Sequence, residues 1–394
     1  MVMAHPSDIP LPSRPATREL VWAARLAESI TDPISRLRFL QSVVELPGSP
    51  SQNRWRRARG IRIAALLLAT LIPGMLLLMR ATAPEVVARP DPTVARPRTG
   101  TTLPEVWQVE KTADSETYSN GLRIDTRFEV AGQPRGYLVF PMDGSGGGAA
   151  TPRDNPAGIV FHVTESAQAP FEPGQNRALK RIGESLLEYV GRKRAYHFVI
   201  DRFGRVYRVV REGDAAHHAG YSVWADERFL YLNLNESFLG VAFEARSGPP
   251  GVEPEINPAQ VRAAADLTEM LRARYDIPPG NCVTHAQVSV NPSNMRVGYH
   301  TDWSSSFPYR DIGLPDNYAR ALPAVAVFGF ECDHGFLDSS GDRLHTAINR
   351  AEEDLRARAS RSGSPLLVFR RRLQHEYRDK LAVVQRRSRQ GISP

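Results

Sequence analysis

Apolar and polar positions in the middle of the chain follow two different spacings, and each spacing predicts a different element. Short apolar runs bounded by turn residues predict strands at residues 136–142, 158–166, 196–201, 205–212 and 238–246. Helical spacing marks residues 176–193 and 257–279, and the second of these segments opens with Asn-Pro and ends with Pro-Pro. A further short strand or strand end is expected at 282–288. This order predicts an α/β domain over residues 105–330, with a mixed central sheet flanked by helices.

One long apolar run, residues 63–79, interrupts the polar N-terminal part of the chain. Its 17 residues are at the short end for a helix that spans a bilayer. Five arginines lie in residues 54–62, so the positive-inside rule places the N-terminus in the cytoplasm and the rest of the chain outside. A buried core helix rarely has so few polar residues. A cleavable signal peptide is the stronger alternative, because an A-x-A site follows at 81–83, but its charged n-region would be far too long. We therefore expect an uncleaved single-pass anchor at residues 61–80 of the cytoplasmic (inner) membrane.

The segments on either side of the anchor have different compositions. Residues 1–60 contain two apolar stripes at helical spacing, which predict a small cytosolic helical segment whose partner is unknown. Residues 81–104 contain five prolines and predict a semi-rigid linker that holds the next domain away from the membrane. At the other end, residues 331–394 form a basic tail with helical stretches near 343–358 and 365–387. Four tail residues are candidates for packing on the domain: Leu366, Leu367, Phe369 and Leu373.

Charge and composition restrict the possible functions. The 394 residues are 42% hydrophobic and 24% charged, which is typical of a globular protein. The net charge of +7 belongs to residues 341–394, which have 13 Lys and Arg against 6 Asp and Glu, so a general nucleic-acid-binding function has little support. The basic tail binds anionic wall polymer or lipid, or is a solvated helix face, which we favour. Cys282 and Cys332 are too few for a disulfide scaffold or a cysteine-rich zinc module. They either form one bond or are two buried small hydrophobic residues.

Candidate chemistry lies at the ends of the predicted strands. His162 ends one apolar strand and His285 ends another, and strand ends at one rim of a sheet are where α/β folds place sites. Asp302 follows 17 residues after His285, and two histidines with one carboxylate form a catalytic zinc set that leaves a fourth position open. His300 shares a face with Asp302 if the chain is extended there. Each histidine taken alone is more often a polar core or surface residue, so this pattern leaves open whether the three residues form a site.

Six segments between residues 158 and 302 carry motifs in a fixed order. They read VFHVTES, AYHFVIDRFGRVYRVV, AAHHAG, NESFLGVAFEA, VTHAQVSV and YHTDW. Together they resemble the type 2 N-acetylmuramoyl-L-alanine amidases, the family of the AmpD amidases, a phage lysozyme and the peptidoglycan recognition proteins. The resemblance is collinear and covers more than a third of the chain.

The resemblance implies a reaction and the residues that carry it. The reaction is hydrolysis of the amide bond between N-acetylmuramic acid and L-alanine in peptidoglycan. The implied metal is zinc, held by His162, His285 and Asp302. Tyr196 falls on the catalytic tyrosine of the phage and recognition-protein branch, and His300 stands where the family has a lysine. Either side chain would stabilise an oxyanion, and His300 would also relay a proton.

The resemblance also indicates residues that would contact the peptidoglycan substrate. His218 falls on the histidine of the family's WHAG element, with His217 in place of the tryptophan. Asn235 falls on the asparagine of a second motif. Thr164, the small polar residue just after the first predicted metal ligand, completes the candidate substrate-binding set.

The sequence departs from the family pattern at two places. Ala242 stands where AmpD amidases have an acidic residue, although Glu244 lies two residues further on the same face of the strand. Trp303 and Ser304 replace the Pro-Gly pair that follows the aspartate ligand. The metal set is intact, and the acid/base partner remains open. Two alternatives to an enzyme therefore remain: a membrane-tethered peptidoglycan-binding module without catalysis, and a structural tether from membrane to wall.

The predicted orientation has a direct test. A reporter that is active only outside the cytoplasm, fused after Pro394, should be active because the arginine cluster precedes the apolar run. An inactive fusion, together with activity of a cytoplasm-dependent reporter at the same site, would contradict the predicted topology.

Overall fold

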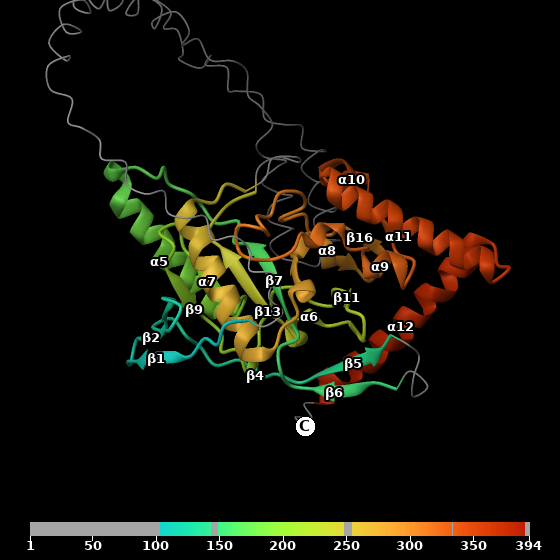
Figure 1. The fold of residues 1–394 in the computed structure, drawn as a ribbon, viewed down its shortest axis with the longest axis horizontal. Coiled ribbons are helices and arrows are strands. Elements are labelled where there is room, and N and C mark those ends of the chain that lie inside the picture. The colour runs from blue at the N-terminus through green and yellow to red at the C-terminus, as the bar shows by residue number, and fades with distance from the viewer. Residues whose placement is uncertain (1–102, 143–148, 248–253, 333, 391–394) are drawn as a thin grey trace, which may run out of the picture. The chain divides into compact units, whose positions relative to one another are not determined.

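The computed structural model describes residues 103–142, 149–247, 254–332 and 334–390. The expected cytosolic segment 1–60, the anchor 61–80 and all but the last two residues of the linker 81–104 lie outside the described residues. Within the described ranges, no helix has both the length and the apolar character that crossing a bilayer requires. The predicted α/β domain with a mixed sheet and flanking helices is confirmed (Figure 1).

An eight-stranded sheet forms the centre of the described residues. Its strands, in spatial order, are β1 (Gln108–Lys111), β2 (Ser115–Tyr118), β3 (Arg123–Asp125), β9 (Val206–Arg208), β8 (Phe198–Ile200), β13 (Phe238–Phe243), β7 (Gly158–Val163) and β14 (Cys282–Thr284). The neighbours β8, β13, β7 and β14 run parallel, whereas β9 is antiparallel to β8. The sheet is therefore mixed, and its parallel half contains the strands predicted to carry the histidines.

The two central strands are buried on both faces. Every residue of β7 and β13 is buried, as expected for parallel strands that are covered on both sides. His162 is the one polar side chain in β7, and in the register it lies opposite Ala242 of β13. A polar residue at this depth requires partners, because an unpaired buried polar group is costly.

Helices cover both faces of the sheet. The helices are α5 (Asn176–Lys193), α6 (Leu234–Ser237), α7 (Pro258–Tyr275), α8 (His285–Val288), α9 (Pro323–Ala326), α10 (His334–Ser339), α11 (Asp342–Arg361) and α12 (Leu366–Gln390). Helix α5 buries Leu187 and Val190 against Val199, on the face of the sheet that also carries His162. The α7 side chains Leu267 and Leu271 join the core on the opposite face.

Smaller sheets and the C-terminal helices complete the fold. The short strands are β4 (Gln133–Pro134) with β10 (Asp214–Ala215); β5 (Tyr137–Pro141), β6 (Thr151–Arg153), β11 (Trp224–Ala225) and β12 (Phe229–Tyr231); and β15 (Val290–Asn291), β16 (Arg296–Val297) and β17 (Glu331–Cys332). Leu344 of α11 and Tyr377 of α12 belong to the same core cluster as the central sheet.

The two helices expected in the basic tail are confirmed, as α11 and α12. Of the tail residues expected to pack, Phe369 and Leu373 are buried against α11, and Leu366 packs there in part. Leu367 is 66% exposed, so its predicted packing is wrong: it lies on the solvent-facing side of the first turn of α12. Cys282 is buried and Cys332 is half-buried, and no disulfide joins the two.

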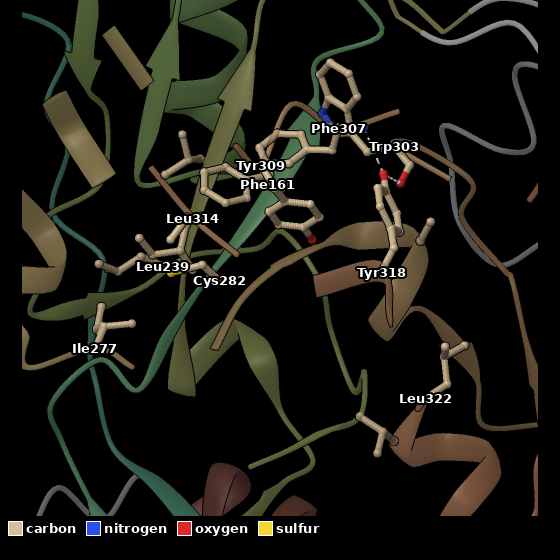
Figure 2. Close-up of a cluster of buried hydrophobic side chains, with 14 of the residues drawn as sticks. Phe161, Leu239, Ile277, Cys282, Trp303, Phe307, Tyr309, Leu314, Tyr318 and Leu322 are labelled. Atoms are coloured by element: carbon tan, nitrogen blue, oxygen red, sulfur yellow. Dashed lines mark hydrogen bonds between the residues drawn. The ribbon is translucent and has the colours of Figure 1, made fainter. Parts of the chain in front are cut away.

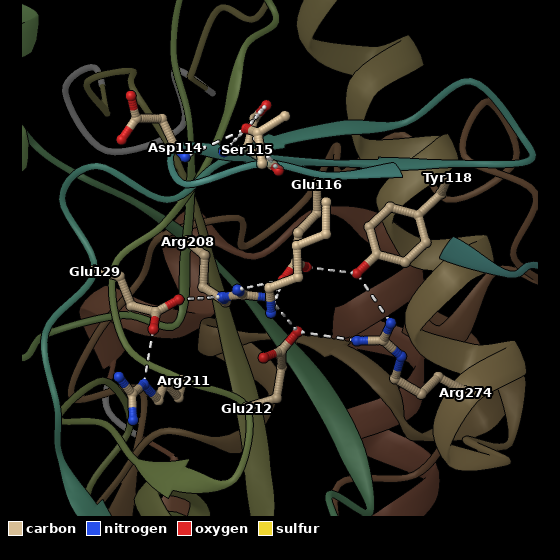
Figure 3. A network of polar contacts seen from close by, with 11 residues as sticks. Asp114, Ser115, Glu116, Tyr118, Glu129, Arg208, Arg211, Glu212 and Arg274 are labelled. Carbon is tan, nitrogen blue, oxygen red and sulfur yellow. Dashed lines mark hydrogen bonds and ion pairs between the residues drawn. The ribbon is translucent and has the colours of Figure 1, made fainter. Parts of the chain in front are cut away.

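A buried network of ion pairs joins the N-terminal strands to the rest of the domain (Figure 3). Arg208 on β9 makes a bidentate contact with Glu116 on β2, at 2.9 Å for each pair of atoms, and its Nε lies 2.6 Å from Glu129. Burial alone would raise the pKa of Glu116, but hydrogen bonds from Arg208 and Tyr118 lower it to about 2. The network therefore fixes residues 116–129 on the strands that follow later in the chain.

We predict that Arg208→Met lowers the free energy of unfolding at pH 7 by about 3–5 kcal/mol, because it removes the buried guanidinium that Glu116, Glu129 and Glu212 share. The depressed pKa of Glu116 stabilises the folded wild type above pH 4.5 and ceases to do so as the pH falls towards 2. The difference between the two proteins should therefore shrink over that interval in urea unfolding curves. Arg211→Met is the matched control, because the exposed Arg211 pairs only with Glu129 in the described network, and it should change stability little. Equal effects of the two substitutions would contradict a dominant role for the buried contact.

Candidate metal centre

The structure brings the three predicted metal ligands together. One ligand atom from each of His162, His285 and Asp302 lies within 4.8 Å of the others. Asp302 is central, with Oδ1 2.9 Å from His285 Nδ1 and Oδ2 3.5 Å from His162 Nδ1. Both imidazoles are buried, and the Asp302 side chain is 11% exposed. Residues 140 positions apart in the chain thus form one compact donor set.

Each ligand is placed by a different element. His162 comes from the buried strand β7. His285 is the first residue of α8, directly after β14, where Thr284 and Gln287 form a capping box that sets the start of the helix. Segment 282–288 is therefore a strand followed by a helical turn. Asp302 lies in a turn rather than a strand, and its carbonyl accepts a hydrogen bond from the backbone N–H of Ala286 at 3.2 Å.

Trp303 fixes the Asp302 turn, a role that the sequence motifs did not indicate. Its indole N–H donates to the carbonyl of His162 at 3.1 Å, and its own carbonyl accepts from the hydroxyl of Tyr318 at 2.7 Å. Its backbone has φ 60°, a left-handed conformation that a bulky residue adopts only when its surroundings impose it. Figure 2 shows the ring beside Phe307 in the buried cluster. The available signal was that Trp303 replaces the family's proline immediately after the aspartate.

Electrostatics favour a cation at this position. Burial lowers the pKa of His162 to about 4, with a further contribution from His285, so His162 is neutral at pH 7. Burial would raise the pKa of Asp302, but its contacts with His285 and His162 hold it well below the ordinary value. A charged carboxylate and neutral imidazoles are the protonation states that bind a metal. Two nitrogens and one carboxylate oxygen suit zinc, so the residues present fit the ion that the resemblance implies.

The two predicted catalytic residues lie beside the ligand set. The Tyr196 ring is 5.2 Å from the His162 ring, between centroids. The His300 ring stacks on His285 at 4.6 Å and an interplanar angle of 21°. His300 and Asp302 therefore approach His285 from a loop and its turn, not from one face of an extended strand as the spacing had allowed.

The four predicted substrate residues occupy different environments. The amide oxygen of Asn235 accepts three backbone hydrogen bonds, from His218, Ala219 and Gly220, at 2.7–2.8 Å. His218 contacts His162 at 3.0 Å, whereas His217 is exposed. Thr164 is half-buried and its hydroxyl lies 2.9 Å from that of Ser166. Their contacts with substrate remain predictions.

Position 242, next to the metal centre, is an alanine and provides no carboxylate. It lies in register with His162 on the neighbouring strand. Glu244, two residues further, is buried and its Oε2 accepts the backbone N–H of Arg202 at 3.1 Å. Burial raises the pKa of Glu244. Glu244 is thus committed to the β8–β9 turn.

Comparison with known proteins places the ligands inside a family match. Residues 152–302 match the sequence profile described as N-acetylmuramoyl-L-alanine amidase, a span that ends at Asp302. The chain is similar to the N-acetylmuramoyl-L-alanine amidase AmiD of Escherichia coli K12, with 34% identity over 89 residues. That alignment covers 22% of this chain and 31% of AmiD, so the chain spans about a third of that relative's length.

Two solved structures with bound ligands are also similar. One is AmiD of Escherichia coli in complex with the substrate anhydro-N-acetylmuramic acid-L-Ala-D-gamma-Glu-L-Lys, at 20% identity and a TM-score of 0.35, covering 50% of this chain and 88% of AmiD. The other is AmpDh3 of Pseudomonas aeruginosa with an anhydromuramic pentapeptide, at 23% identity and a TM-score of 0.30, covering 40% and 58%. Similarity at these TM-scores carries no argument, and the profile match covers residues 152–302 only.

Proposed function

We propose that the protein is a zinc-dependent amidase of the type 2 N-acetylmuramoyl-L-alanine amidase family, because residues 152–302 match the amidase sequence profile. It hydrolyses the amide bond between N-acetylmuramic acid and L-alanine of peptidoglycan, in remodelling or degradation of the cell wall. The observation that carries the proposal is the grouping of His162, His285 and Asp302 within 4.8 Å, inside the matched span. A zinc ion in such a set lowers the pKa of water and polarises a carbonyl.

The residues around the metal centre supply the remaining chemistry. Hydrolysis of an amide develops negative charge on the carbonyl oxygen and requires a proton for the leaving nitrogen. The hydroxyl of Tyr196, beside His162, is a neutral donor for that oxygen. His300, stacked on His285, has an ionisable ring that donates a hydrogen bond or relays a proton near neutral pH. We assign His300 the position of the family lysine, with the added capacity to transfer a proton.

We also propose that the enzyme acts outside the cytoplasm, held at the inner membrane by residues 61–80. The support is the sequence alone: an apolar run preceded by five arginines and followed by a proline-containing linker. This placement gives the domain access to peptidoglycan, the polymer that the family acts on.

A non-catalytic peptidoglycan-binding module is the second candidate, and one observation favours it. Ala242 provides no carboxylate beside His162, and the nearby Glu244 is bound to the backbone of Arg202. A site that lacks a general base but keeps its metal would bind muropeptide without turnover. The activity measurements below separate the two candidates.

We predict that the wild-type chain binds one zinc ion and that alanine at His162, His285 or Asp302 removes most of it, because a site with three protein ligands cannot spare one. On purified peptidoglycan the wild type should release free amines, the new L-alanine termini, without new reducing ends. Exposed His345 on α11 provides the control, since His345→Ala removes a histidine outside the centre. Stoichiometric zinc in the His162→Ala protein would show that the ligand set is wrong. Zinc binding without amine release would favour the binding module.

We predict that His300→Ala keeps zinc but lowers turnover by about 10²-fold, because a donor or proton relay is lost. His300→Lys should restore part of the rate and move the basic limb of the pH–rate profile upwards, since lysine has the higher ordinary pKa. Zinc content is measured alongside each profile. Loss of zinc from His300→Ala in parallel with Asp302→Ala would identify His300 as a ligand instead.

A further inference from the structure

His218 lies directly behind the ligand His162. Its Nδ1 is 3.0 Å from His162 Nε2, the ring nitrogen remote from Asp302, and its Nε2 is 3.2 Å from the carbonyl oxygen of Phe238. Both ring nitrogens of His218 therefore have a partner within the domain. The four groups form a chain that runs from Phe238 through His218 and His162 to Asp302.

The direction of these hydrogen bonds follows from the Phe238 carbonyl, at one end of the series of four groups. A carbonyl oxygen only accepts, so His218 must donate from Nε2 to Phe238. A neutral imidazole has one N–H, and in His218 the Phe238 carbonyl accepts it, so the Nδ1 of His218 is an acceptor. His162 must then donate from Nε2. Its Nδ1 carries a bare lone pair towards Asp302 Oδ2, which is 3.5 Å away.

The arrangement is built to keep the His218 ring in place. A Cβ added at Gly240 on β13 would lie 2.6 Å from Cγ of His218, so the ring occupies the space that a side chain would take. The backbone of His218 is fixed by Asn235, whose amide oxygen accepts its N–H at 2.8 Å. A larger residue at position 240 would have to displace the ring.

Arg135 fixes the acceptor at the far end. Arg135 as a whole residue is 3% exposed. Its guanidinium donates to the carbonyls of Glu212 and Asp214 at 3.0 Å, of Phe238 at 3.3 Å, and of Glu236. Burial lowers the pKa of Arg135 to about 10, so it is still charged at neutral pH. The Phe238 carbonyl thus accepts from both Arg135 and His218. Arg135 lies before residue 152, outside the span of the family match.

We propose that His218 and Arg135 are positioning residues that hold His162 as the Nε2–H tautomer and so present its Nδ1 lone pair to the metal. The identity of the metal as zinc rests on the proposed function. The tautomer of His162 follows from the hydrogen bonds and does not depend on that function. The positioning role also means that a residue before the matched span, Arg135, contributes to the geometry of the metal centre. The partners of ligating histidines commonly set the tautomer and raise metal affinity in this way.

The test measures tautomer and zinc affinity in the full-length chain. With ¹⁵N-labelled histidine and no metal, long-range ¹H–¹⁵N correlation should show His162 protonated at Nε2 in the wild type. In His218→Ala, His162 should change to the Nδ1–H tautomer, which donates to Asp302 and hides the ligand lone pair. Zinc affinity, measured by chelator competition, should fall about 10- to 100-fold.

Three further variants separate positioning from loss of fold. His218→Asn places an amide oxygen near the former Nδ1 and should recover part of the affinity. Gly240→Ala keeps all four hydrogen-bonded groups but displaces the His218 ring. Its His162 tautomer and zinc affinity should therefore resemble those of His218→Ala. Arg135→Lys keeps the charge but cannot reach all four carbonyls, and should weaken zinc binding. Arg208→Lys, a substitution of another buried arginine in the separate ion-pair network, should leave the tautomer and affinity unchanged.

The outcomes distinguish this inference from the proposed function. A wild-type His162 protonated at Nδ1, or a His218→Ala protein with unchanged tautomer and zinc affinity, would overturn the inference while leaving an amidase possible. A wild type that binds no zinc would overturn the proposed function, and the tautomer of the metal-free protein would still decide the role of His218. Equal losses of zinc affinity in Arg135→Lys and Arg208→Lys would show that Arg135 acts through the general stability of the fold and does not position His162.

Discussion

The Asp302 carboxylate, charged and nearly buried between two imidazoles, is the constraint on which the rest of the centre depends. A buried charge is tolerated only when it is paired, and the neutral His162 does not compensate it. A cation shared by the three residues would complete the compensation. The Asp302 carboxylate must also be held in place, because a carboxylate that turned towards water would no longer contact His162 and His285. This explains why Asp302 is followed by the strained and buried Trp303, whose indole is bound to the backbone of His162.

Support for the centre comes from parts of the chain that lie far apart in the sequence. On strand β13, Gly240 leaves the space that the His218 ring occupies. The carbonyls of Glu212 and Asp214 accept hydrogen bonds from Arg135. Arg135 directly follows β4, which pairs with β10 at residues 214–215. The three ligands lie within the matched span, residues 152–302. Arg135, before this span, contacts the Phe238 carbonyl to which His218 donates. Substitutions in residues 103–142 should be judged for effects on the metal centre as well as on stability.

The sequence predicted the elements that carry strong local signals. Helix 258–275 has an Asn-Pro start, and β7 and β13 are continuous apolar runs, so both kinds of element were identified from sequence. The three ligands followed from a family resemblance and not from spacing. Arg135 gave no signal, because most of its partners are backbone carbonyls, which have no residue type that a pattern could reveal. Leu367 was misassigned because an apolar residue on a helix end satisfies a packing pattern and a solvent-facing position equally well.

X-ray absorption at the zinc edge of the metal-loaded full-length chain would identify the atoms that bind the metal. We predict a four-coordinate ion with two imidazole nitrogens, the Asp302 oxygen and one solvent oxygen, all at about 2.0–2.2 Å. Replacing Asp302 with alanine should remove the zinc rather than exchange one ligand for another. A third imidazole in the wild-type spectrum, from His300 or His218, or a sulfur scatterer at about 2.3 Å, would contradict the proposed donor set.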